Sequence, residues 1–388
     1  MAEDIAGSST PRLLIVSTVP VTHSAFLMPF AEHYRSLGWR VDGMAAGLPG
    51  AGAASVYDQV WDASWSRNPL DPRNLWRAAP QVRKVVAREG YDIVHVHTPV
   101  AGFVTRFALR KLRRTRGVKV IYTAHGFHFA EGLGRVRNAL FIALERLGGR
   151  WTDRLVVINE DDLKAARTLH ITEASRVRLI HGIGVDTEQF APGTVDPKAV
   201  EALRSEFAVP PDAPLFTMVA EFTANKRHGF ALDALLEADT PDVALVCVGD
   251  GPLRERIEAR SRASGLAGRV RFTGYRRDLP GLIAAADAGL LVSEREGLPR
   301  SLLEVMACGT PAVGTRTRGI VDAIGDTGWI VDRQDPRELA QLVRKLPEMR
   351  DDVLERGRAA RLRACEFSLD VVLRAYEELY SEALSQRV

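Results

Sequence analysis

Residues Glu294–Gly314 have the sequence Glu-Arg-Glu-Gly-Leu-Pro-Arg-Ser-Leu-Leu-Glu-Val-Met-Ala-Cys-Gly-Thr-Pro-Ala-Val-Gly. The apolar run Ala288–Val292 precedes them and predicts a buried strand, and Pro311–Val313 predicts a second short strand. A loop and a short helix fit between the two strands. In an open α/β sheet, ligands bind beyond the carboxyl ends of the strands, where free N–H groups at helix starts also point. We therefore expect a ligand site here.

Two glutamates of this segment, Glu296 and Glu304, stand eight residues apart. Ser301 suits an N-cap and Gly309 a C′ position, which predicts a helix over Leu302–Cys308. Ser301 and Glu304 also have the spacing of a capping box, in which Glu304 would only close its own helix. Glu296 lies in the loop before the helix, where no structural need for an acid is evident. For Glu304, the cap and the ligand contact are both open alternatives at this point.

The pattern Glu-Gly-Leu-Pro-(x)4-Glu-x-Met-Ala-x-Gly-x-Pro over residues 296–311 resembles the signature of retaining glycosyltransferases of family 4. The resemblance implies the GT-B fold, which consists of two Rossmann-like α/β domains with a cleft between them. It also implies a nucleotide-sugar donor, most often a UDP-sugar, and a lipid-linked glycan or polysaccharide precursor as acceptor. We expect no separate cofactor, no nucleic-acid partner and, because no Asp-x-Asp motif stands out, no metal.

The composition agrees with an ordinary two-domain globular protein. The chain has 388 residues, 46% of them hydrophobic and 26% charged, and we find no run of eighteen apolar residues that would predict a membrane span. Its three cysteines, Cys247, Cys308 and Cys365, are far apart, which favours a reducing, cytoplasmic setting over a disulfide framework. Residues 1–190 carry a net charge of +7 and residues 191–388 a net charge of −4. The basic first half favours an anionic partner on that side.

Strands and helices alternate along the chain, which predicts parallel sheets covered by helices. A segment with five prolines, Phe190–Pro214, separates two such series and indicates a domain boundary. The predicted strands are Leu13–Ser17, Arg40–Ala45, Ile93–His97, Lys119–Thr123, Arg154–Ile158, Val177–Ile180, Leu215–Val219, Ala244–Val248, Val270–Thr273 and Ala288–Val292. The predicted parts are a disordered start (1–11), an acceptor-side domain (12–190), a nucleotide-sugar domain (191–365) and, as the resemblance implies, a helix that returns to the first domain (366–388).

The resemblance places the donor on the second half of the chain. Lys226 matches the basic residue that binds the diphosphate in the family, whereas a lysine at a helix start would otherwise be electrostatically unfavourable. Glu221 stands where the family often has a second basic residue, so Arg227 or Arg300 would have to supply that contact. By the same resemblance, Glu296 holds a hydroxyl of the donor sugar and Glu304 the ribose hydroxyls. The remaining donor-side candidates are Gly274, Tyr275, Arg276, Gly297, Leu298, Pro299 and Ser301.

The first half supplies histidines at predicted strand ends. His125 follows the strand Lys119–Thr123 and matches the family histidine beside the donor sugar, so His125 and Glu296 are the catalytic candidates. The acceptor-side candidates are His23, Ser24, His97 and His128. His95 shares a strand face with His97, and we expect it to be a hydrogen-bonded sheet residue.

Two other functions fit the same architecture: a nucleotide-sugar 2-epimerase and a non-catalytic sugar-nucleotide-binding protein. A transferase acting on a soluble natural product is a further alternative. The basic segment Arg106–Lys119 contains seven cations and no acid. It is either a core-facing helix with a solvated basic end or a docking patch for an anionic bilayer, which would place the enzyme peripherally at the inner face of the membrane.

Overall fold

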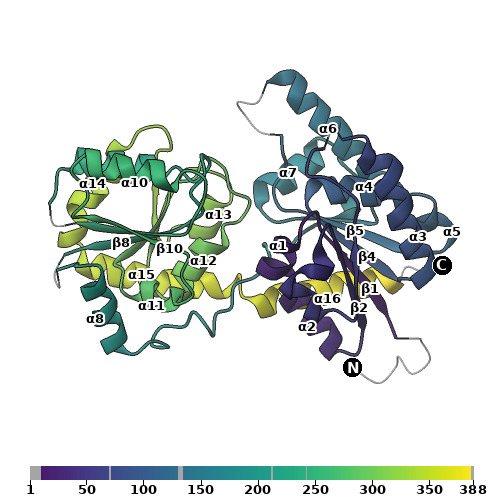
Figure 1. The fold of residues 1–388 in the computed structure, drawn as a ribbon, viewed down its shortest axis with the longest axis horizontal. Helices are drawn as coiled ribbons and strands as arrows, with labels where there is room; N and C mark the ends of the chain where they lie inside the picture. The colour runs from purple at the N-terminus through teal and green to yellow at the C-terminus, as the bar shows by residue number, and fades with distance from the viewer. Residues whose placement is uncertain (1–9, 70, 130–133, 211–212, 242, 386–388) are drawn as a thin grey trace. The chain divides into compact units, whose positions relative to one another are not determined.

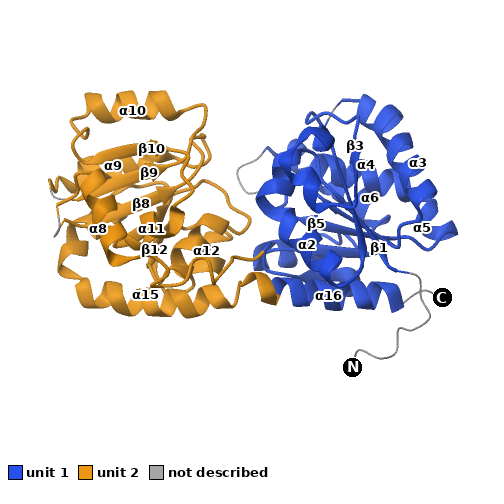
Figure 2. Cartoon of the chain, turned by 60° about the horizontal axis from the view of Figure 1, so that its bottom comes forward, with its two compact units in different colours: residues 1–183, 372–388 blue, residues 184–371 orange. Residues whose placement is uncertain are grey.

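The computed structural model describes residues 10–69, 71–129, 134–210, 213–241 and 243–385. The chain forms two compact units (Figure 2). Unit 1 comprises the residues up to Ile183 together with those from Val372 onward, and unit 2 comprises Gly184–Val371. The disorder predicted for residues 1–11 falls mostly on residues 1–9, which lie outside the described part. Every helix in the described part is too short or too polar to cross a bilayer.

Unit 1 is built on a parallel sheet of seven strands (Figure 1). Its order is β3-β2-β1-β4-β5-β6-β7, so the direction of strand addition reverses between β1 and β4. Ligands bind at such a switch point in open α/β sheets. The strands are β1 (Arg12–Val16), β2 (Arg40–Ala45), β3 (Gln59–Asp62), β4 (Ile93–His97), β5 (Lys119–Ala124), β6 (Arg154–Val157) and β7 (Val177–Leu179).

The helices of unit 1 connect successive strands. They are α1 (Pro20–Thr22), α2 (Met28–Ser36), α3 (Ala79–Glu89), α4 (Pro99–Leu109), α5 (Leu112–Thr115), α6 (Arg135–Gly149) and α7 (Glu160–Thr168), with π-helical turns at His23–Leu27 and Asn74–Ala78. α4 begins at Pro99, because proline is well suited to the first turn of a helix, where its missing N–H costs nothing.

The last helix, α16 (Leu369–Ser385), packs most of its length into unit 1. Its buried face carries Tyr376 and Tyr380. The Tyr380 hydroxyl lies 2.5 Å from Nδ1 of His95, and the Tyr376 hydroxyl lies 3.0 Å from Oγ1 of Thr123. His95 Nε2 is 2.7 Å from the same threonine oxygen. His95 is therefore a hydrogen-bonded sheet residue, as predicted, and it ties α16 to β4 and β5.

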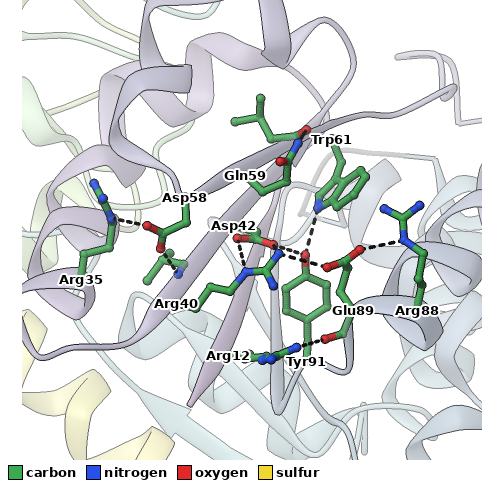
Figure 3. Close-up of polar contacts among 12 residues, drawn as sticks. Arg12, Arg35, Arg40, Asp42, Asp58, Gln59, Trp61, Arg88, Glu89 and Tyr91 are labelled. Carbon is green, nitrogen blue, oxygen red and sulfur yellow. Dashed lines mark hydrogen bonds and ion pairs between the residues drawn. The ribbon is translucent and has the colours of Figure 1, made fainter. Parts of the chain in front are cut away.

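A second polar network braces unit 1 around the buried carboxylate of Asp42 on β2 (Figure 3). Arg40 donates to both oxygens of Asp42 at 3.2 and 2.9 Å, and the Tyr91 hydroxyl donates to Oδ2. Trp61 Nε1 donates to the Tyr91 oxygen at 2.9 Å, and Arg40 also reaches Glu89 at the end of α3. Since a buried charge is stable only when paired, this network fixes β2 and β3 against α3.

Unit 2 contains a parallel sheet of six strands in the order β10-β9-β8-β11-β12-β13. The strand order reverses between β8 and β11, which are hydrogen-bonded neighbours. The strands are β8 (Leu215–Val219), β9 (Ala244–Val248), β10 (Val270–Gly274), β11 (Ala288–Leu291), β12 (Ala312–Thr315) and β13 (Trp329–Val331). Both units thus have the predicted Rossmann-like architecture.

Helices cover the second sheet as they cover the first (Figure 1). One helix lies unusually close to the sheet: a Cβ on Gly289 of β11 would stand 2.4 Å from a methyl of Val305, so only glycine allows this approach. The helices are α8 (Pro197–Glu206), α9 (His228–Ala238), α10 (Arg254–Ala263), α11 (Leu279–Ala284), α12 (Arg300–Ala307), which carries Val305, α13 (Ile320–Ile324), α14 (Arg337–Lys345) and α15 (Arg350–Cys365).

Candidate active site

The loops that follow β8 and β11 are tied together at the switch point of unit 2. The Asn225 side chain donates to the carbonyl of Arg295 at 3.0 Å and accepts from the Arg295 N–H at 3.2 Å. The Asn225 carbonyl accepts from the N–H of Glu294 at 2.8 Å. These bonds bring Lys226 Nζ to 2.6 Å from Oε1 of Glu296, and both side chains are largely buried.

The Lys226–Glu296 ion pair is suited to bind a polar ligand. An ammonium group has three donors, and one contact with Glu296 leaves the others able to turn toward an anion. A carboxylate accepts hydrogen bonds only, so Glu296 fits a hydroxyl or a cation. The sequence predicted both residues as donor-side groups, and the structure adds that they contact each other.

The start of α12 differs from the sequence prediction. The helix begins at Arg300 with Pro299 in the N-cap position, not at Leu302 after a Ser301 cap. Ser301 is therefore inside the first turn, and Glu304 lies beyond the third helical position that a capping box requires. The prediction of a Ser301 cap was wrong. Glu304 therefore does not form a capping box with Ser301. A proline preceded by an extended loop can start a helix without a side-chain cap.

Glu304 is buried on α12 and is paired with Arg300 one turn earlier, whose Nε lies 2.9 Å from Oε1. Burial raises the pKa of the Glu304 carboxyl, and the nearby Arg300 guanidinium partly opposes that rise. A buried carboxylate with a raised pKa is a frequent mark of a functional site.

A neighbouring loop supports the turn that carries Glu296 and Gly297. Gly319 has φ 74°, and a Cβ at this position would stand only 2.1 Å from the carbonyl oxygen of Gly297. Leu298 packs against the core of unit 2. Gly297 and Leu298 therefore fix the shape of the loop, and Glu296 is presented on a supported turn.

Arg227 is held in place by its own unit. Its backbone has a left-handed φ of 54°, and its guanidinium bonds the carbonyl of Arg333, lies 3.4 Å from Glu294 and lies 4.4 Å from the Phe230 ring centre. A non-glycine residue in this conformation costs free energy and is found where surrounding contacts enforce it. Arg227 directly follows Lys226 in the chain, so these contacts hold the backbone next to the lysine.

The three donor-side candidates at the end of β10 and just after it have different environments. Arg276 forms ion pairs with Glu206 and Asp278, each at 2.7 Å. Two carboxylates of the same unit therefore already balance its positive charge. Tyr275 is 78% exposed and is accessible to a flat ligand such as a base. Gly274 has φ 72°, and its carbonyl accepts from Gly249 at 2.9 Å, which joins the ends of β9 and β10.

Three histidines of unit 1 lie side by side: His95 and His97 on β4, and His125 directly after β5. Nδ1 of His97 lies 3.0 Å from Nε2 of His125, and the ring centres of His95 and His97 are 4.1 Å apart. Burial lowers the pKa of His125 to about 4, that of His95 to about 3 and that of His97 well below its ordinary value. All three imidazoles are therefore neutral near pH 7. Each has one donor and one acceptor nitrogen, so His97 selects the tautomer of His125.

A strained residue that sequence reasoning missed follows His97. Thr98 has φ 67° and ψ 146°, a conformation that non-glycine residues rarely adopt. Its hydroxyl accepts from the Thr18 N–H at 3.0 Å and lies 2.6 Å from the Thr18 hydroxyl. These contacts join the loops after β1 and β4, at the switch point of unit 1. Backbone strain leaves no signal in the sequence, so the sequence alone did not single out Thr98.

The three other acceptor-side candidates have different environments. His23 is buried, with Nδ1 2.6 Å from the Tyr57 hydroxyl and Nε2 3.3 Å from the Met44 carbonyl, so both ring nitrogens are used inside the unit. Ser24 is exposed, and its hydroxyl donates to the Val21 carbonyl at 3.2 Å. His128 is exposed beside the ring of Phe141. No three His, Cys, Asp or Glu side chains gather into a metal-binding group within the described residues.

Comparisons with known proteins agree with this architecture. Residues 25–189 match the model of Glycosyltransferase Family 4, and residues 213–348 match that of Glycosyl transferases group 1. The chain is 34% identical over 367 residues to the putative glycosyltransferase EpsD of Bacillus subtilis, covering 92% of this chain and 93% of that protein. It is 29% identical over 246 residues to the UDP-Gal:alpha-D-GlcNAc-diphosphoundecaprenol alpha-1,3-galactosyltransferase of Escherichia coli, covering 61% of this chain and 60% of that protein.

Solved structures share the fold. The Anabaena protein Alr3699/HepE in complex with UDP superposes with a TM-score of 0.79 at 19% identity, over 96% of this chain and 100% of that one. WaaG, a glycosyltransferase involved in lipopolysaccharide biosynthesis, gives 0.74 at 18% identity, over 95% and 99%. These superpositions show that the chain has the GT-B fold, as predicted. The two family models and the 34% identical relative show that it is a glycosyltransferase. Within that class, the chain belongs to glycosyltransferase family 4.

Proposed function

We propose that this glycosyltransferase moves a hexose from a UDP-sugar to a lipid-linked glycan or polysaccharide precursor, with retention of the anomeric configuration. The observation that carries the donor assignment is the Lys226–Glu296 pair at the switch point of unit 2. The names of two similar proteins support the substrate classes: the Escherichia coli relative is a UDP-Gal transferase for a diphosphoundecaprenol-linked sugar, and the Anabaena structure contains UDP.

The ion pair suggests how the donor is bound. The diphosphate of a UDP-sugar would compete with Glu296 for Lys226 Nζ, since phosphate oxygens are strong acceptors for an ammonium group. Once Lys226 turns to the diphosphate, the Glu296 carboxylate is released to accept from a hydroxyl of the sugar. Glu304 would accept from the ribose hydroxyls, and Tyr275 would cover the base.

The bond changes follow from the leaving group. The bond between the sugar C1 and the diphosphate oxygen breaks, and the acceptor hydroxyl oxygen forms a bond to C1 on the same face. Its proton passes to the departing phosphate oxygen. Negative charge develops on the diphosphate as the bond to C1 breaks. Lys226 stabilises this charge in the transition state. We propose that no separate cofactor or metal takes part.

A neutral His125 suits this reaction. Positive charge develops on the sugar ring as the bond to the diphosphate breaks, and a protonated imidazole beside it would oppose that change. His125 would orient a sugar hydroxyl through one nitrogen, while His97 holds the other at 3.0 Å. The lowered pKa of His125, about 4, keeps the ring neutral throughout the ordinary pH range.

The reaction can be tested with a labelled UDP-sugar and a panel of diphosphoundecaprenol-linked sugars. We expect an acceptor-dependent product whose new linkage keeps the donor's anomeric configuration in its NMR spectrum. An inverted linkage would contradict the mechanism. An altered UDP-sugar formed without any acceptor would identify an epimerase instead, and transfer only to soluble acceptors would contradict the acceptor class. We propose a cytoplasmic enzyme that works at the inner face of the membrane, where such lipid-linked acceptors would be reached.

A further inference from the structure

Helix α6 presents apolar side chains to solvent. The exposed fractions are 86% for Val136, 51% for Leu140, 36% for Leu144 and 37% for Leu147. These residues lie at positions i, i+4, i+8 and i+11 of a regular helix, so they fall within about 80° of its circumference. They form one stripe about 17 Å long, which we call the α6 stripe.

The opposite face of α6 is the one that packs on unit 1. Phe141 and Ile142 pack against the core, and Glu145 pairs with the buried Arg106 at 3.1 Å (α6 and the neighbouring α4 are labelled in Figure 1). A surface helix of a globular protein normally turns its apolar stripe inward and its charged residues outward. In α6 the only acid, Glu145, points inward, and the α6 stripe points outward. A contiguous exposed apolar stripe of this kind marks a candidate interaction surface.

Arginines border the α6 stripe. Four of them are exposed on or just after the helix: Arg135, Arg137, Arg146 and Arg150. Arg146 Nε also donates to the Leu169 carbonyl at 2.7 Å, so Arg135, Arg137 and Arg150 are the main candidates for contact with a partner. Arg137 and Arg135 lie about 100° to either side of Val136, so the stripe has positive charge along both edges. The exposed face of α6 thus combines valine and leucine with arginine and lacks an acid among its exposed residues.

We propose that α6 is a docking helix for an anionic lipid bilayer. An interfacial helix buries its apolar face at the boundary of headgroups and acyl chains, and its cations contact anionic lipids. The long arginine side chains reach the headgroups while their stems stay beside the apolar stripe. A symmetric pair of α6 helices is a poorer fit, because an isologous contact places the same surface of both copies together and opposes arginine with arginine.

The basic segment Arg106–Lys119, in contrast, is not a free docking patch. Arg106 is buried over the Tyr122 ring, and its guanidinium pairs with a glutamate of α6. Arg113 donates to both oxygens of Asp153 at 2.8 Å, and Arg116 donates to a carbonyl of α3. The structure therefore favours the core-facing alternative for this segment and moves the membrane hypothesis to α6.

This inference extends the acceptor class proposed above, but its test needs neither donor nor acceptor. The protein is sedimented at low salt with vesicles that contain phosphatidylglycerol and with vesicles of phosphatidylcholine alone. We expect binding to the anionic vesicles that falls steeply as salt is added. The double variant Leu140→Glu/Leu144→Glu should bind at least about tenfold more weakly, since each leucine would be removed from the apolar boundary.

A matched control changes two equally exposed leucines on α15 of unit 2. Leu354 and Leu362 are 61% and 73% exposed, and Leu354→Glu/Leu362→Glu should leave vesicle binding unchanged. The thermal midpoint and UDP affinity of both double variants show whether each protein is folded and able to bind the proposed donor. Equal binding by wild type and Leu140→Glu/Leu144→Glu would overturn the proposal, as would failure of the wild type to bind anionic vesicles. A dimer abolished by Leu140→Glu/Leu144→Glu, without vesicle binding, would assign α6 to a second copy of the chain and would also overturn it.

Discussion

Replacing Glu304 tests whether this buried carboxylate contacts the ribose of the donor. The carboxylate lies inside unit 2 with Arg300 2.9 Å from Oε1. If ribose hydroxyls donate to this carboxylate, Glu304→Ala removes a charged hydrogen-bond partner and weakens UDP binding by about 1–3 kcal/mol. That range corresponds to a loss of roughly 5- to 150-fold in affinity. Glu304→Gln keeps an acceptor oxygen, so its loss should lie at the lower end of the range.

The assay is calorimetric titration of UDP into wild type, Glu304→Ala and Glu304→Gln. Glu355→Ala is the matched control, because this glutamate belongs to the same unit but is exposed on α15. Equal affinities for wild type and Glu304→Ala would refute the ribose contact and leave Glu304 as a structural partner of Arg300. A second arm varies the pH. Since the Glu304 pKa is raised, the UDP contact should be lost as the pH falls through that raised value, before an ordinary carboxyl would be protonated.

Glu296→Gln and His125→Ala should each lower kcat by more than they lower UDP affinity, measured by steady-state kinetics and calorimetry, because both are placed at the sugar; equal losses would contradict that placement. Asp42→Asn should lower the free energy of unfolding by about 3 kcal/mol with UDP affinity unchanged, as denaturant titration would show, because it breaks a buried ion pair. The neutral, buried His95 should make the protein less stable as the pH falls from about 6.5 towards 3, since its lowered pKa lets the unfolded chain bind the proton first. His95→Gln should flatten this part of the stability profile, and an unchanged slope would show that other groups cause it.

The sequence predicted the architecture well because the strands of parallel sheets are continuous apolar runs. β2, β4, β8 and β9 have the predicted bounds. β3 and β13 were not predicted: β3 (Gln59–Asp62) has no fully buried residue to produce an apolar run, and β13 has only three residues. Their places at the sheet edges depend on pairing with β2 and β12, which no local pattern encodes.

The site was predicted one residue at a time, whereas its contacts depend on residues far apart in the chain. The Lys226–Glu296 pair depends on bonds from Asn225 to a loop 70 residues away. The burial of His23 depends on Tyr57, which local sequence gives no reason to place there. For α6, the sequence contains two sets of apolar positions on one helix. Periodicity alone does not tell which set faces the core, and only the packing of Phe141 on unit 1 decides it.

Whether a donor diphosphate takes Lys226 from Glu296 can be measured by titrating UDP into Lys226→Met, Glu296→Gln and wild type. Lys226→Met should bind UDP much more weakly than wild type, because a cation opposite the diphosphate is lost. Glu296→Gln should bind UDP as tightly as wild type or more tightly, because the competing carboxylate is gone. If Glu296→Gln loses as much UDP affinity as Lys226→Met, the ion pair is a structural element of the loop and the diphosphate does not displace Glu296.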